Sequence, residues 1–207
     1  MGRLEIKSSE KIKAFLDEEH VGRIASIDKI GYPQIIPMNF VFLNDVIYMH
    51  SYPKGEKIDN IITNSKVGFE VDRELEFLPS YFSHPTDASL ADTLYISVVI
   101  KGNAFVVSNL QEKSMGLNAL MKKYQPEGHY DPIKDDMLVL DEVTVIKIIP
   151  ESVKGKYKIG QNISSDSRMI LAQKILDRNS STSKETLQIM GFEITDNRLI
   201  MTDEPLW

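Results

Sequence analysis

Three strand-like segments follow one another closely near the start of the chain, and their spacing limits the fold more than any other feature. They cover Val21 to Ile27, Pro33 to Leu43 and Val46 to Ser51. The breaks between them are short, contain Asp, Asn and Gly, and suit tight turns. A parallel pair would need a crossover of a dozen residues or more, so we predict an antiparallel meander. Pro33 and Pro37 cannot donate to a ladder, which places the second strand at a sheet edge or a bulge.

The rest of the chain supplies further strands and a few short helices. Apolar residues recur at helical spacing in three segments, residues 9–20, 58–64 and 111–124. Three more strands are predicted over residues 66–72, 94–108 and 137–150, with a long ordered loop over residues 73–93. Six predicted strands with few long helices indicate a mainly β protein: a small antiparallel, Greek-key-like barrel with flanking helices. After it come a Lys-rich loop from Glu151, a helix over Asp166 to Asp177 and one more short helix.

Composition excludes several classes of function. The chain has 24 Lys and Arg against 30 Asp and Glu, a net charge of −6, with no basic tract, which makes a nucleic-acid partner unlikely. Cysteine is absent, so thiolate catalysis, disulfides and Cys-metal sites are excluded. The first residues lack the apolar core of a signal peptide, and no apolar run is long enough to span a bilayer. We expect a cytoplasmic protein without membrane association.

Familiar catalytic motifs are also missing. The sequence contains no Gly-rich phosphate loop, dinucleotide fingerprint, His-Glu-x-x-His or Gly-x-Ser-x-Gly motif. The histidines, at positions 20, 50, 84 and 129, are too far apart in sequence for a local metal site, and we predict none.

The segment from Val46 to Asp72 carries the strongest chemical signal. A strand ends at His50 and Ser51, a Pro-Gly turn follows, and Lys57 lies at the start of a helix. A helix N-terminus offers unpaired N–H groups and a positive dipole end, while the lysine adds a full charge and the serine a hydroxyl donor. This arrangement suits a phosphate. A solvated Lys-rich turn is the alternative explanation.

The same segment resembles the pyridoxamine 5′-phosphate oxidase-like split barrels that bind FMN, in particular the nitroimidazole-resistance and PaiB-like branch. The similarity rests on five motifs in the family's order: Gly31-Tyr32-Pro33 with Ile36-Pro37-Met38-Asn39, His50-Ser51-x-Pro53-x-Gly55-x-Lys57, Tyr95 to Gly102, Glu112 to Tyr124, and Val153 to Asn162 with Asp166 and Arg168. The resemblance implies a split-barrel domain over residues 1–168, followed by a helical extension over residues 169–207 packed on the same domain.

The resemblance also implies roles for particular residues. FMN would lie between the two subunits of a homodimer, with its phosphate at Lys57 and its ring along the strand segment Ile35, Ile36, Pro37, Met38 and Asn39. His50 and Ser51 would lie beside the flavin, with His50 as the proton donor or substrate anchor. Three further cofactor contacts are implied, at Ser97, Lys158 and Gln161.

The implied activity is hydride transfer between a reduced nicotinamide and a small organic substrate. Two departures stand out: Glu56 replaces an arginine beside the phosphate-binding lysine, and Ile96 replaces the arginine of the "Y-R-S-V" strand. The oxidase's C-terminal Trp-Arg segment is missing, so oxidation of pyridoxine phosphate is not predicted. The alternatives are a flavin- or haem-binding regulator or sensor without turnover, a haem-degrading split barrel, and use of F420 in place of FMN.

Overall fold

The computed structural model describes residues 4–196, 198–202 and 205, which form two compact units. The described part of unit 1 comes from residues 4–8, 72–97 and 155 onward, and unit 2 comprises Ser9–Val71 and Val98–Lys154. Each unit is therefore assembled from separate stretches of chain. The long strands β6 (Lys66–Leu78), β7 (Asp92–Val106) and β8 (Thr144–Lys158) each contribute residues to both.

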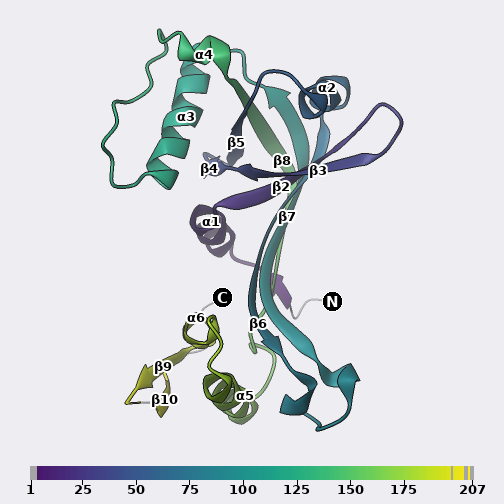
Figure 1. Cartoon of the computed structure of the whole chain (residues 1–207), viewed down its shortest axis with the longest axis vertical. Helices are drawn as coiled ribbons and strands as arrows, with labels where there is room; N and C mark the ends of the chain where they lie inside the picture. The colour runs from purple at the N-terminus through teal and green to yellow at the C-terminus, as the bar shows by residue number, and fades with distance from the viewer. Residues whose placement is uncertain (1–3, 197, 203–204, 206–207) are drawn as a thin grey trace. The chain divides into compact units, whose positions relative to one another are not determined.

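One eight-stranded sheet contains most of the strands (Figure 1). Its order is β3-β2-β6-β7-β8-β5-β4, with β1 paired to β8, and every pairing with a recorded register is antiparallel. The shorter strands of this sheet are β1 (Glu5–Ile6), β2 (Val21–Ile27), β3 (Pro33–Asn39), β4 (Val41–Leu43) and β5 (Val46–Ser51). This architecture confirms the predicted mainly antiparallel β fold with flanking helices.

The helices of unit 2 are α1 (Ser9–Glu18), α2 (Glu56–Thr63), α3 (Leu110–Tyr124) and the single turn α4 (Val139–Glu142). Helix α3 begins where the Asn109 side chain accepts a hydrogen bond from the N–H of Glu112 at 2.8 Å. It lies against β4 and β5 (Figure 1). Buried residues of α3 and of the neighbouring elements form one core cluster, which consists of Val41, Tyr48, Val107, Leu117, Leu120, Leu140 and Val145.

A polar network joins α3 to the sheet. The carboxylate of Glu112 accepts hydrogen bonds from Lys147 Nζ at 2.8 and 2.9 Å and from the Tyr48 hydroxyl at 3.0 Å. The hydrogen bond from Lys147 is the main cause that lowers the pKa of Glu112. Burial raises the pKa of Tyr48 to about 12, and the hydrogen bond to Glu112 and the charge of Glu112 add to this shift. Since Tyr48 and Lys147 are paired across β5 and β8, one carboxylate fixes the helix to both strands.

Unit 1 holds the C-terminal part of the chain. Helix α5 (Ser165–Arg178) ends at Asn179 in the left-handed conformation, and α6 (Ser183–Ile189) leads into a hairpin of β9 (Phe192–Thr195) and β10 (Arg198–Met201). The buried carboxylate of Glu76 on β6 accepts bonds from Arg178 (2.9 Å), Ser180 (2.6 Å) and Thr182 (2.8 Å). This network ties the α5–α6 connection to β6, because a buried carboxylate requires such donors.

Several predicted boundaries differ from the structure. The predicted loop over residues 73–93 is shorter in the structure: β6 runs to Leu78 and β7 begins at Asp92, which leaves residues 79–91 and their two short 3-10 turns between the strands. The predicted last strand begins later, at Thr144, and continues through the expected Lys-rich loop to Lys158. The segment 33–43 divides into two strands, β3 and β4, so the predicted number of six strands was wrong. The C-terminal extension contains the β9–β10 hairpin as well as helices, so the prediction of a purely helical extension was also wrong. These strand extensions were not predicted because polar residues and lysines interrupt their apolar alternation.

No helix of the described residues is both long and apolar enough to cross a membrane.

The predicted boundary at residue 168, between a family domain and its C-terminal extension, stays a prediction. It is a different division from the one between the two compact units.

Gly102 on β7 gives a test of strand packing in unit 2. A Cβ there would lie 2.3 Å from the carbonyl oxygen of Ile149 on β8, a backbone atom that cannot move aside alone. We expect Gly102→Ala to lower the free energy of unfolding by about 2 kcal/mol, measured by urea titration. Gly68→Ala is the matched control, since its Cβ would meet nothing closer than Ala25 Cβ at 3.7 Å. Equal stability of the two variants would contradict this packing.

Candidate functional site

The turn between β5 and α2 leaves the N-terminus of α2 open. Gly55 is the residue before the helix, with φ of 131°, and no side chain caps the first turn. The N–H groups of Ile58 and Asp59 both donate to the Gly55 carbonyl, at 2.9 and 3.2 Å. The first two N–H groups of the helix therefore remain for an external acceptor such as an anion.

Lys57 lies in this first turn and is half-buried. Its Nζ donates to the sulfur of Met38 on β3 at 3.3 Å. A thioether is a weak acceptor and carries no charge, and no described carboxylate forms an ion pair with this lysine. Burial lowers the pKa of Lys57 because the ammonium loses hydration without gaining a counter-charge. The site thus holds a cation that an anionic ligand would neutralise.

Acidic side chains also lie near α2. Glu56 and Asp59 are exposed on its first turn, and with Asp28 they line a cavity of about 320 Å³ between the helix and the β2–β3 turn. The Asp28 carboxylate already accepts bonds from the N–H groups of Ile30 (2.9 Å) and Tyr32 (2.8 Å). Among the described residues no group of His, Asp or Glu side chains could hold a metal ion.

Strand β3 is at one end of the sheet order, and its recorded pairing is with β2 alone. The register is continuous from Val21↔Asn39 to Ile27↔Pro33, so the predicted edge position is confirmed and no bulge occurs. Pro33 and Pro37 have no N–H and fit the pairs whose backbone groups point away from β2. By the same alternation, the N–H and C=O of Ile35 face the open edge. These groups suit the polar edge of a flat ligand.

One polar atom on β3 was not anticipated from the sequence. The Gln34 side-chain oxygen is buried, and no described atom donates a hydrogen bond to it. Its cross-strand neighbour Ser26 instead accepts a bond from Asn60 of α2, at 3.3 Å. An orphaned acceptor is costly, which makes Gln34 a further candidate for ligand contact. Only its inward position in the strand alternation could have indicated this.

The other predicted residues of unit 2 lie at the end of β5 and along β3. His50 is exposed at the end of β5, and Ser51 is half-buried with its hydroxyl donating to the Tyr52 carbonyl at 3.0 Å. On β3, Ile35, Pro37 and Asn39 are exposed, whereas Ile36 and Met38 are half-buried. Among these residues a recorded side-chain contact joins Lys57 to Met38.

Three predicted residues belong to unit 1. Ser97 is half-buried on β7, and Lys158 forms an ion pair with Asp92. The Gln161 amide accepts from the N–H of Ile159 at 2.9 Å and donates to the carbonyl of Tyr157 at 3.0 Å. The side chains of Lys158 and Gln161 are thus engaged by protein atoms, and a cofactor role for all three stays a prediction.

The geometry described above agrees with a comparison against protein families. The model of the pyridoxamine 5′-phosphate oxidase family matches residues 8–157, most of the chain. The chain belongs to this family. The match includes β3, the end of β5 and the first turn of α2, the elements that form the site.

Solved structures with the same fold include several proteins of low sequence identity. A candidate 5-nitroimidazole antibiotic resistance protein from Bacteroides thetaiotaomicron is 22% identical, with a TM-score of 0.62 over 74% of this chain and 86% of the other. The flavocytochrome Anf3 from Azotobacter vinelandii is 16% identical, with a TM-score of 0.64 over 75% and 69% of the two chains. An FAD and heme binding protein from Mycobacterium smegmatis is 16% identical, with a TM-score of 0.65 over 80% and 78%. No curated protein sequence matches the chain. At such identities these structures show the fold alone, and they confirm the predicted split barrel.

Two departures from the family pattern have structural consequences. Glu56, in place of an arginine, adds a negative charge to the first turn of α2 and leaves Lys57 as the half-buried cation there. Ile96 is fully buried on β7, where an arginine could not be solvated. The first turn of α2 thus presents one half-buried cation, Lys57, and not a cluster of basic residues.

The unneutralised charge of Lys57 predicts a stability change. An uncharged side chain of similar length avoids the cost of burying the ammonium, so Lys57→Met should be at least as stable as wild type without ligand. Because the pKa of Lys57 is lowered by folding, wild-type stability should rise as pH increases through that pKa, and the variant should lose this increase. Thermal unfolding from pH 7 to about 10.5 measures both effects. Marked destabilisation of Lys57→Met at neutral pH would contradict the assignment.

Proposed function

We propose that this protein binds FMN and uses it to transfer hydride from a reduced nicotinamide to a small organic substrate. We further propose that it acts in the cytoplasm as a homodimer with FMN between the subunits, without a nucleic-acid or membrane partner. The observation that carries the proposal is Lys57, a half-buried ammonium at an uncapped helix N-terminus whose recorded partner is a thioether. A phosphate supplies the charge and the acceptor oxygens that this site lacks.

The open edge of β3 supports binding of the flavin ring. Backbone N–H and C=O groups at Ile35 face this edge, and they match the alternating acceptors and donors of an isoalloxazine. Pro37 and the half-buried Ile36 and Met38 offer apolar surface along the same strand. The buried Gln34 oxygen provides one further acceptor. The donor and acceptor set of this strand therefore fits a flavin.

The flavin would supply the hydride chemistry, and the chain's own residues would position it and move protons. His50 is exposed beside Ser51 at the end of β5, and five residues separate it from the start of α2 at Glu56. Imidazole is the side chain that most often acts as a general acid or base in enzymes. We assign it the delivery of a proton to the substrate as the substrate is reduced.

Apolar side chains on the outer face of β2 and β3 support the homodimer. Val21, Ile27 and Ile35 are exposed, and their register places them on one face of the hairpin. Exposed apolar surface of this kind is typical of interfaces. A second subunit would cover it and would enclose a ligand bound along β3.

Other cofactors define the competing outcomes. The Azotobacter protein is a flavocytochrome, and the Mycobacterium protein binds FAD and heme. The visible spectrum and the mass of the group released by heat distinguish FMN from FAD, F420 and haem. A protein that binds none of them would overturn the proposal.

FMN affinity gives the sharpest test of the phosphate site. Lys57→Ala should weaken FMN binding by about tenfold or more, because it removes a charge-assisted hydrogen bond. Riboflavin, which lacks the phosphate, should bind wild type and variant alike. The matched control is Lys54→Ala, which removes an exposed lysine from the same turn and should change little. Quenching of flavin fluorescence measures these affinities for wild type and both variants, and an equal loss for riboflavin would show that Lys57 does not hold the phosphate.

The role of His50 is tested by kinetics on the flavin-loaded protein. His50→Asn should lower the rate of substrate reduction by about 100-fold or more and leave FMN affinity and flavin reduction by the nicotinamide nearly unchanged. Stopped-flow absorbance separates these two half-reactions. If only FMN affinity changes, His50 is a binding residue and not the proton donor.

A further inference from the structure

A cavity in unit 1 is built from residues with no assigned role. Its volume is about 260 Å³, and it lies between the segment joining β6 to β7 and helix α5. The wall from α5 begins after residue 157, beyond the region that the family model matches. None of the described lining residues is among those assigned to the flavin site above.

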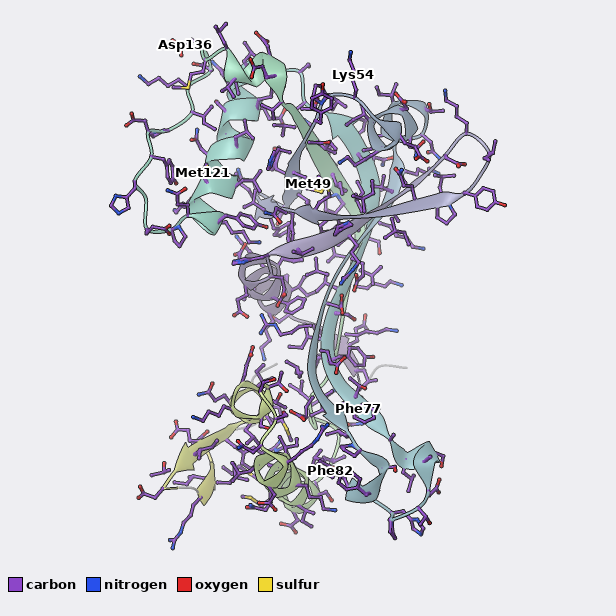
Figure 2. All side chains as sticks on the ribbon, in the orientation of Figure 1. Met49, Lys54, Phe77, Phe82, Met121 and Asp136 are labelled. Carbon is purple, nitrogen blue, oxygen red and sulfur yellow. The ribbon has the colours of Figure 1, made fainter. Side chains whose placement is uncertain are left out.

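Apolar side chains form most of the cavity lining. They are Leu78, Pro79, Phe82, Leu90, Ile170 and Leu171, and Phe82 is labelled in Figure 2. Leu90 is 44% exposed and Ile170 is 59% exposed, so two lining residues remain open to solvent. An apolar lining with exposed apolar residues is typical of small-molecule sites.

The charged residues of the lining differ in their partners. Asp92 forms an ion pair with Lys158. Partial burial opposes its ionisation, but hydrogen bonds from Lys158 and from the N–H of Thr93 lower the pKa of Asp92 overall. This carboxylate is therefore ionised and neutralised by the protein itself.

Lys174 has no such neutralisation. Its Nζ donates to the carbonyl oxygen of Phe82, and among the described residues no carboxylate forms an ion pair with it. The lining thus carries one uncompensated positive charge beside an apolar volume. A ligand that satisfies both features has an apolar body and a single negative group.

We propose that this cavity binds a small apolar monocarboxylate of about six to eight carbons in all, with its carboxylate at Lys174. The volume is small for a ligand pocket and excludes long fatty acids and nucleotides. Aryl acids and alkyl acids both combine an apolar body with one carboxylate. Phenylacetate represents the aryl acids and hexanoate the alkyl acids.

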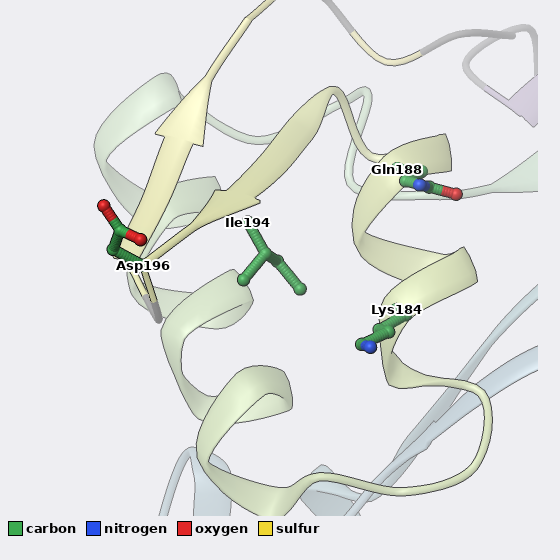
Figure 3. A pocket seen from close by; sticks show the side chains of 4 residues that line it. All are labelled: Lys184, Gln188, Ile194 and Asp196. Carbon is green, nitrogen blue, oxygen red and sulfur yellow. The ribbon is translucent and has the colours of Figure 1, made fainter.

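A second cavity in unit 1 provides the control. It has a volume of about 560 Å³ and is lined by Lys184 and Gln188 of α6, Ile194 of β9 and Asp196 (Figure 3). Its described lining residues present opposite charges and a single apolar side chain, so they do not match an apolar acid.

Calorimetric titration of the full-length protein tests the proposal, with phenylacetate, hexanoate and phenylacetamide as probes. Phenylacetate or hexanoate should bind with one site per chain, and phenylacetamide, which lacks the charge, should bind at least about tenfold more weakly than phenylacetate. Lys174→Gln should weaken the acids by about tenfold or more and abolish the preference for acid over amide, while Lys174→Arg should retain it. Lys184→Gln should leave all three affinities unchanged.

A structural role for Lys174 would change the melting temperature without changing the preference for acid over amide, and so would overturn the assignment. Ile170→Trp is a second variant, at an exposed position where folding should tolerate it, and it should reduce binding by filling the cavity mouth. Equal binding of acid and amide to wild type would contradict the proposal, as would absence of binding to about 10 mM of every probe. These results are independent of flavin binding, which is measured on the same samples.

Discussion

The carboxylate of Glu112 is the contact on which the arrangement of unit 2 depends. It joins helix α3 to Tyr48 on β5 and to Lys147 on β8, so one residue sets the helix against both strands. Removal of any partner would leave a half-buried charge or hydroxyl unsatisfied, which costs more than the bond itself contributes. Strand β5 then ends at Ser51 in a fixed place, and the turn to α2 starts from that point. Lys57, in the first turn of that helix, lies beside Met38 of β3.

Much of the fold was readable from local patterns. The close spacing of the first strands predicted the meander, and Pro33 and Pro37 predicted that β3 lies at an edge, because proline lacks the donor that an interior strand needs. The extended course of β6 and β8 was not readable, because polar residues and lysines interrupt the apolar alternation after Asp72 and Glu151. These strands are decided by pairing with distant neighbours, and a local pattern contains no information about such pairing.

The candidate site was predictable only in part, for a similar reason. The Pro-Gly turn before Lys57 indicated a helix N-terminus and hence an anion site. The contact with Met38 and the missing side-chain cap depend on tertiary structure, and so does the orphaned oxygen of Gln34. The sequence named the residue types at the site, whereas burial and partners, which decide whether a lysine is functional, required coordinates.

Comparison of the lysines shows how that decision is made. Lys147 and Lys158 have carboxylate partners that neutralise their charges. Lys113 and Lys123 lack ion pairs in the recorded contacts, yet they bond carbonyls at the ends of α4 and α1, where the helix dipole favours a cation.

Lys123 is the instructive case. Burial lowers its pKa to about 8, although the charges of Asp17 and Glu19 oppose the shift, and its ammonium lies 4.0 Å from the Phe40 ring centroid. A lowered pKa therefore does not identify a binding residue. Lys57 and Lys174 differ because each combines an uncompensated charge with a second feature that suits a ligand: an uncapped helix N-terminus beside Lys57 and an apolar cavity beside Lys174. The charge together with this second feature, and not the charge alone, is the physical basis for assigning ligands to these two lysines.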